Sequence, residues 1–112
     1  MLQPSDPRIP VRFAPAMGGS FAVLREAGAP PAPPGAALVV EFSLLAHRIG
    51  CACCGGRPLA ALAFDRLFLA RVKGDCPWFD AVHALPAGAA GRAALIAALD
   101  EDRTTRARFR RD

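Results

Sequence analysis

The sequence predicts a small three-layer α/β domain with a short, mainly parallel sheet. Residues 37–42 form a near-continuous apolar run of the kind found in buried parallel sheets, and residues 78–85 are predicted to form a second hydrophobic strand. Between them, residues 58–72 place apolar side chains at helical spacing, which makes a strand–helix–strand unit. With 112 residues the chain is long enough for one modest core, built from Leu, Val, Phe and Ala because only 7% of the residues are aromatic.

The N-terminal part is expected to hold a leader, a strand and a short helix. Residues 1–10 contain three prolines and no periodicity, which indicates an extended leader before a single domain over 11–112. A short strand is predicted over 11–14, and a glycine turn then leads into a short helix predicted over 21–27. Residues 28–36 contain four prolines, so this stretch is expected to be a stiff surface connection.

The C-terminal part is expected to end in a helix and a basic tail. A glycine turn at 73–75 ends the preceding helix, and a loop at 86–91 leads to a last helix that starts over 92–99. The tail 103–112 holds five arginines of a chain whose net charge is +4, so it is either a solvated helix end or a surface that meets phosphates or an acidic partner. Because Phe109 is the only aromatic side chain in the tail, nucleic-acid binding is not expected.

The sequence carries no membrane or secretion signal. It has no run of about 18 uncharged apolar residues, and its N-terminus lacks the charged and apolar regions of a signal peptide. The chain is therefore expected in the cytoplasm, with no membrane contact. In that compartment its four cysteines are expected to be thiols or metal ligands rather than disulfides.

Three of the four cysteines lie in one short stretch. Cys51, Cys53 and Cys54 fall within four positions, whereas Cys76 lies elsewhere. Thiolates this close in sequence bind a soft or borderline metal, form a redox pair, or sit reduced in a core. The cluster is expected in a loop that runs into a helix N-terminus, where the helix dipole favours the thiolate form.

A zinc site built on this cluster needs a fourth ligand, because structural zinc is tetrahedral. The candidates are Cys76, His47, His83 or a second protein chain. Adjacent cysteines point in different directions, so the pattern favours a transient or intersubunit site over a rigid structural one. The other interpretation is that the cysteines are packed, reduced thiols. A histidine in an apolar strand, such as His83, is more typical of a core residue than of a ligand.

Four stretches, in this order, resemble a known family. Gly50-Cys51-Ala52-Cys53-Cys54 is similar to the GCxCC metal motif of the CobW-type GTPases, a family of nucleotide-dependent metallochaperones. The helix predicted after it, 57–72, resembles the arginine-containing helix that follows those cysteines. Phe79-Asp80-Ala81-Val82 resembles the strand that reads Phe-Asp-x-Val, and Leu95 to Asp112 resembles a leucine-rich helix and its Ala-Arg-Phe/Tyr-Arg ending. The resemblance covers Ile9 to Asp112 and implies the first half of a P-loop GTPase domain.

The nucleotide-binding motifs that the resemblance implies are missing from this sequence. A phosphate-binding loop needs G-x-x-x-x-G-K-[ST], but the corresponding turn over 14–21 contains no lysine, and the only lysine of the chain is Lys73. Where the family has Glu-Thr-x-Gly, this chain has Leu85-Pro86-Ala87-Gly88. The resemblance therefore implies a truncated, degenerate member that neither binds GTP tightly nor hydrolyses it, and that is not an enzyme.

The predicted function is a metal-binding protein related to the CobW-type metallochaperones, with zinc as the expected metal at Cys51, Cys53 and Cys54. Gly18, Gly19 and Ser20 are a second candidate site, for an anion, because glycine turns before helices bind anions. The first alternative is a non-catalytic module that binds a protein partner or oligomerises, because half a domain leaves an open sheet edge. A GTP-binding metallochaperone is the further alternative.

Overall fold

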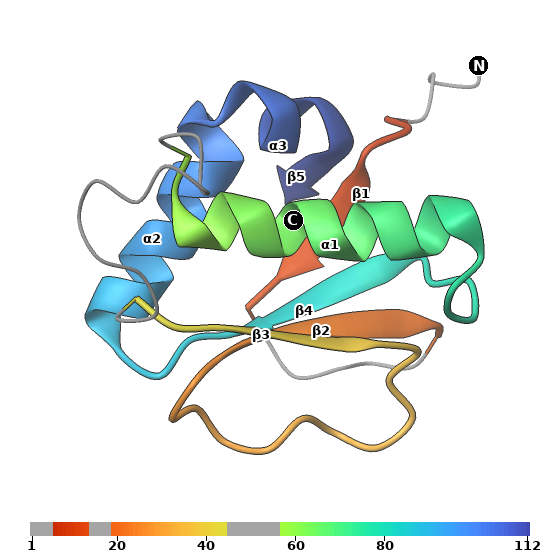
Figure 1. Ribbon diagram of the computed structural model, residues 1–112, viewed down its shortest axis with the longest axis horizontal. Helices are drawn as coiled ribbons and strands as arrows, with labels where there is room; N and C mark the ends of the chain where they lie inside the picture. The colour runs from red at the N-terminus through yellow and green to blue at the C-terminus, as the bar shows by residue number, and fades with distance from the viewer. Residues whose placement is uncertain (1–5, 14–18, 45–56) are drawn as a thin grey trace.

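A computed structural model describes residues 6–13, 19–44 and 57–112 of the chain. These residues form an α/β domain, which confirms the predicted fold class (Figure 1). All pairings in the five-stranded sheet are parallel, and the strand order is β3-β2-β4-β1-β5. The strands are β1 (Ile9–Arg12), β2 (Phe21–Glu26), β3 (Val39–Phe42), β4 (Ala81–Leu85) and β5 (Phe109–Arg111).

Three helices accompany the sheet in the described part of the chain: α1 (Leu59–Lys73), α2 (Ala89–Glu101) and α3 (Arg103–Arg108). A helix was predicted over 58–72, and α1 begins and ends one residue later because Pro58 stands just before the helix. Gly74 ends α1 in the left-handed conformation, with a φ of 74°, as the predicted glycine turn requires. None of these helices combines the length and the apolarity that crossing a bilayer requires.

The order of the strands explains the layers. The connections from β3 through α1 to β4, and from β4 through α2 and α3 to β5, move across the sheet in the same direction. Parallel crossovers are right-handed, so both place their helices on the same face. The connection from β2 to β3, residues 27–38, moves in the opposite direction and passes over the other face. Figure 1 shows α1 on one side of the sheet and this non-helical segment on the other.

The core fills the space between the sheet and the helices. Alternate residues of every strand point to the helical face, as the period of two requires. Phe64 of α1 lies against Phe109 of β5, with ring centroids 4.9 Å apart, so the last strand is tied to the middle of the core. The buried residues that form this cluster on the strands are Ile9, Val11, Ala22, Leu24, Val40, Phe42, Val82, Ala84 and Phe109.

The opposite face of the sheet buries His83. This side chain is 1% exposed in the middle of β4, and its ring meets the ring of Phe21 edge to face with centroids 5.0 Å apart. Val23 of the neighbouring strand is also buried on this face. The surroundings are those of a core histidine in aromatic contact, which is the interpretation that the apolar strand favoured over a metal ligand.

The predicted helix over 21–27 is wrong, because these residues form β2. Strand β2 lies between β3 and β4, so its backbone is hydrogen-bonded on both sides. Its first four residues, Phe21 to Leu24, are all buried, which a helix packed on one face could not achieve. Pairing with two neighbouring strands therefore overrides the helical spacing of a short apolar run.

The predicted basic tail over 103–112 and the leader over 1–10 are also revised. Residues 103–112 form α3 and then β5, whose Phe109 is fully buried. Ile9, placed in the leader by the sequence, begins β1 because it pairs with Phe109 and is itself buried. The burial of Phe109 and the pairing of β5 with β1 therefore hold the end of the tail at the edge of the sheet.

The proline-rich connection is held in place by Arg25 of β2. The Arg25 guanidinium donates to the carbonyl oxygens of Pro30, at 2.9 Å, and Ala29, and it also pairs with the carboxylate of Glu41. Gly28 has a φ of 94°, which a side chain would disfavour. The connection over 28–36 is thus an ordered surface segment, as its composition predicts.

Candidate functional site

The cysteine cluster falls outside the described residues. Cys51, Cys53 and Cys54, together with the candidate ligand His47, belong to the segment 45–56, whose structure is not described. The described flanks of that segment are Leu44, which follows the carboxyl end of β3, and Arg57, which precedes α1. In parallel α/β sheets the carboxyl ends of the strands carry the functional loops, so the segment leaves the sheet at the edge where sites are usual.

Arg57 fixes the start of α1 through two ion pairs. Its guanidinium pairs with Asp65 of α1, and its Nη2 lies 2.8 Å from Oδ2 of Asp102. The same Asp102 oxygen accepts hydrogen bonds from the backbone N–H and the hydroxyl of Thr105, at 3.0 and 2.8 Å, and so caps α3. The hydrogen bond from Arg57 is the main cause that lowers the pKa of Asp102 to about 2. Both carboxylates raise the pKa of Arg57.

This ion-pair cluster was not among the predicted sites. The signal for part of it is present, since an aspartate at 102 followed by a threonine three positions later is a typical helix start. The pairing of Arg57 with Asp102, 45 positions away, has no local signal and depends on α1 lying beside α3. The cluster places a rigid anchor three residues after the last cysteine of the GCxCC motif.

Cys76 lies at the far end of α1. It follows the C-cap Gly74, is half-buried and packs against the hydrophobic core. Arg57 stands at the opposite end of this 15-residue helix, which is ~22 Å long. Within the described residues there is also no group of three or more His, Cys, Asp and Glu side chains that could hold a metal ion. This arrangement favours a fourth zinc ligand other than Cys76.

The anion site predicted at Gly18, Gly19 and Ser20 has lost its structural basis. Gly18 lies outside the described residues, and Gly19 and Ser20 precede strand β2 rather than a helix. The Ser20 hydroxyl donates to Oδ2 of Asp80 at 2.8 Å, and the Asp80 N–H donates to the Ser20 carbonyl at 3.1 Å. An anion at this turn would meet the Asp80 carboxylate and would find no helix dipole.

Glu26 occupies the start of α2 at the carboxyl end of β2. Its Oε1 accepts a hydrogen bond from the backbone N–H of Ala87 at 2.7 Å. Gly91, in the first turn of α2, leaves the space in which the Glu26 carboxylate lies, because a β-carbon at 91 would overlap that carboxylate. A negative side chain near a helix N-terminus is stabilising, so Glu26 takes the place that an external anion would otherwise take.

Replacing Gly91 with alanine is expected to lower the free energy of unfolding by about 1 kcal/mol, because the methyl group displaces the carboxylate from the Ala87 N–H. Urea denaturation followed by circular dichroism measures this change. In the Glu26→Ala background the same substitution should raise the free energy of unfolding by roughly 0.5–1 kcal/mol, since alanine is the better helix residue. A Gly91→Ala effect of the same sign and size in both backgrounds would show that the two residues do not interact.

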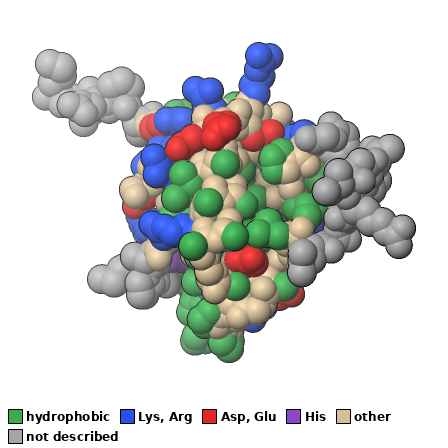
Figure 2. Space-filling view, turned by 90° about the vertical axis from the view of Figure 1, so that its left-hand side faces the viewer, with side chains coloured by type: hydrophobic (Ala, Val, Ile, Leu, Met, Phe, Trp, Pro, Cys, Tyr) green, Lys and Arg blue, Asp and Glu red, His purple; other side chains and the backbone are tan. Residues whose placement is uncertain are grey.

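A surface hollow with a volume of about 520 Å³ lies beyond the carboxyl ends of β1 and β5. It is lined by residues that are far apart in sequence but adjacent in the fold. Phe13 follows β1, two residues come from α2, and the other two are the last residue of β5 and the residue after it. Figure 2 views the molecule from the α2 side, where basic side chains lie beside apolar ones. The lining residues are Phe13, Arg92, Ile96, Arg111 and Asp112.

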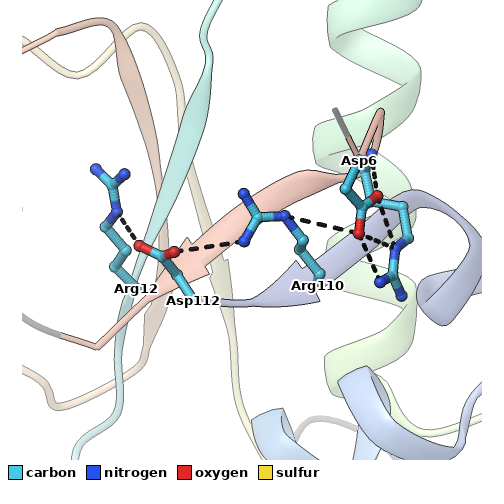
Figure 3. A network of polar contacts seen from close by, with 5 residues as sticks. Asp6, Arg12, Arg110 and Asp112 are labelled. Carbon is cyan, nitrogen blue, oxygen red and sulfur yellow. Dashed lines mark hydrogen bonds and ion pairs between the residues drawn. The ribbon is translucent and has the colours of Figure 1, made fainter. Parts of the chain in front are cut away.

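The charges of the hollow are partly compensated by a row of ion pairs. Oδ2 of Asp112 lies 2.6 Å from Nε of Arg12, and its other oxygen lies 3.4 Å from Nη1 of Arg110 (Figure 3). These arginines, Arg12 first, lower the pKa of Asp112. Arg110 continues the row to Asp6, at 3.9 Å. Asp112 is therefore already bound to two guanidinium groups.

The two arginines that line the hollow, Arg92 and Arg111, are held less tightly than the Asp112 carboxylate. The Arg92 guanidinium lies over the ring of Phe13, with its carbon 4.5 Å from the ring centroid, and no carboxylate among the described residues pairs with it. Arg111 pairs with Asp100 at 3.2 Å, but both side chains are about half exposed. Exposed pairs of this kind contribute little to stability, so both arginines can turn toward a ligand.

None of the family models, curated proteins or solved structures compared with this chain matches it.

Proposed function

We propose that this chain is a zinc-binding protein related to the CobW-type metallochaperones, and that it has no GTPase activity. The observation that carries the proposal is the motif Gly50-Cys51-Ala52-Cys53-Cys54, which offers three thiols within four positions. Thiolates select zinc and other soft or borderline metals over magnesium and calcium. The proposal places Cys51, Cys53 and Cys54 as the protein ligands of the ion.

The start of α1 supports thiolate chemistry at this motif. The first turn of α1 carries no acidic side chain, and Pro58 provides no side-chain cap for the first N–H groups. No carboxylate of the first turn therefore neutralises the partial positive charge at this helix end, and that charge favours anionic groups that come near it. Arg57 and its ion pairs keep this helix end in a fixed position.

The described residues give GTP hydrolysis little support. Lys73, the only lysine of the chain, ends α1 and is exposed at the opposite end from Arg57. Strand β4 ends at Leu85 and is followed by Pro86-Ala87-Gly88, which contains no carboxylate to hold magnesium. Glu26 already occupies the start of α2. Phosphoryl transfer depends on a lysine that binds the phosphates and on a carboxylate that holds magnesium. Their absence from these positions supports a protein that binds metal without hydrolysing GTP.

The fourth ligand is proposed to come from His47 or from a second chain. Cys76 is the weaker candidate because α1 separates it from Arg57. An ion shared between two chains would make metal binding and dimerisation one event, with a mid-point that depends on protein concentration.

Zinc titration under anaerobic, reducing conditions against a chromophoric chelator tests the proposal. We expect sub-micromolar affinity in the parent protein and a loss of about 100-fold or more in the Cys51→Ser, Cys53→Ser, Cys54→Ser triple variant. Cys76→Ser is the matched control, because it also removes one thiol but at the far end of α1, and it should bind zinc as the parent does. Unchanged affinity in the triple variant would reject the cysteine site.

A non-catalytic interaction module is the second candidate function. Strand β3 forms one edge of the sheet, and its Val39 is 44% exposed there. An open edge with an exposed apolar residue can pair with a strand of another protein or of a second copy. Light scattering separates the two candidates. An interaction module associates with or without zinc, and it still associates in the triple cysteine variant. A protein that dimerises through a shared zinc ion associates only when zinc is present, and it does not associate in that variant.

A further inference from the structure

We propose that the hollow lined by Phe13, Arg92, Ile96, Arg111 and Asp112 binds a small molecule that has one anionic group, a carboxylate or a phosphate monoester, on an apolar body. The site is separate from the cysteine motif in sequence, and the proposal does not depend on zinc binding. It rests on three observations: the position of the hollow in the sheet, the state of its charged side chains, and its size.

The hollow lies next to the point where the chain reverses its direction across the sheet. From β1 the chain moves toward β3, whereas from β4 it moves toward β5. The direction in which the chain continues therefore reverses between these two adjacent strands. Ligands of open parallel α/β sheets bind at such switch points. Phe13 follows β1 here, and Arg92 belongs to the helix that follows β4.

The charged side chains of the hollow favour an anion. Arg92 contacts the ring of Phe13 and has no carboxylate partner among the described residues, while the Arg111–Asp100 pair is exposed and readily exchanged. The one carboxylate of the lining, Asp112, is already compensated by Arg12 and Arg110 (Figure 3). Guanidinium groups bind carboxylate and phosphate oxygens in a bidentate manner. A cationic ligand would instead be repelled by the like charges of Arg92 and Arg111.

The size and the apolar wall of the hollow define the rest of the ligand. A volume of about 520 Å³ falls within the range of small-molecule sites and is too small for a protein domain. Phe13 and Ile96 supply a ring and an aliphatic side chain on which a flat or aliphatic body can lie. The combination of one apolar wall with two movable arginines matches an aromatic or short-chain acid better than a bare inorganic ion.

Titration of ¹⁵N-labelled protein with phenyl phosphate and with benzoate, followed by amide chemical shifts, tests the proposal. We expect saturable shifts at the residues around the hollow with both anions, and none with neutral benzamide. Stronger binding of phenyl phosphate would identify the ligand class as phosphate monoesters, and stronger binding of benzoate as carboxylates. Either result supports the site.

Three variants distinguish a built site from general attraction to a basic protein. Arg92→Met should weaken binding of the better anion by about tenfold, and Ile96→Trp, which fills the hollow without changing charge, should weaken it by a similar factor. Arg103→Met is the control, because this exposed arginine of α3 carries the same charge and does not line the hollow. Equal weakening by Arg92→Met and Arg103→Met, shifts that map elsewhere, or binding unaffected by Ile96→Trp would overturn the proposal. Circular dichroism verifies that each variant is folded.

Discussion

Replacing Phe109 with alanine is expected to lower the free energy of unfolding by about 3–5 kcal/mol. The Phe109 ring is fully buried, packs against Phe64 of α1 and meets the ring of Phe68 edge to face at 6.3 Å. Removing it leaves a cavity between β5 and α1 and weakens the pairing of β5 with β1. Urea denaturation followed by circular dichroism gives the change, and a loss of this size is a large part of the stability of a small domain.

Arg106→Ala serves as the matched control for this prediction. Arg106 lies three positions before Phe109, in the same arginine-rich stretch, but its side chain is exposed on α3. Its replacement should change the free energy of unfolding by no more than roughly 0.5 kcal/mol. If the two variants were equally stable, residues 103–112 would be a solvated tail rather than an integral part of the core.

Asp102→Ala is expected to cost about 2–3 kcal/mol, because one carboxylate takes part in three interactions. It caps α3 through the N–H and the hydroxyl of Thr105, and it pairs with Arg57. The Asp102 side chain is only 12% exposed, so its removal leaves Arg57 with one compensating carboxylate fewer in a partly buried place. Asp75→Ala, at an exposed aspartate that begins no helix, should leave stability nearly unchanged.

The same residue makes stability depend on acid. The pKa of Asp102 is about 2 in the folded protein, below its ordinary value of 3.8. A lowered pKa means that the unfolded chain binds the proton more readily, so the contribution of about 2 kcal/mol is complete above pH 4 and is lost as the pH falls toward 2. Denaturation curves of the parent protein should show this decline. Asp102→Ala should show a shallower one over the same interval, and parallel declines would assign the acid sensitivity to other groups.

The parts of the fold that could be predicted from sequence are those with a strong local pattern. Strands β3 and β4 are apolar runs, and α1 is a 15-residue helix with regular apolar spacing, so each carries its own signal. Strand β2 could not be predicted because a run of six residues suits either a helix or a strand. Its pairing with β3 and β4 selects the strand. Strand β5 was hidden because the burial of Phe109 depends on β1, far away in sequence.

The candidate sites divide in the same way. The cysteine motif is visible in sequence because its residues are adjacent, and it stays a prediction since it lies outside the described residues. The hollow near β1 had no sequence signal at all: its lining comes from positions 13, 92–96 and 111–112, which only the strand order brings together. The anion site predicted at Gly18, Gly19 and Ser20 lacks support for a third reason: it depended on a helix after the turn, and residues 21–26 form a strand instead.

The position of β1 between β4 and β5 has a consequence for how the protein is made. Val11 of β1 pairs with Val82 of β4 on one side and with Arg111 of β5 on the other. At ordinary rates of synthesis, roughly 5–20 residues per second, Val82 leaves the ribosome about 4–14 s after Val11. Strand β1 thus waits for both of its neighbours, and this part of the sheet cannot form until they are made. Ile9 and Val11, which are buried in the folded protein, therefore stay without their strand partners for seconds, and slower translation lengthens that interval.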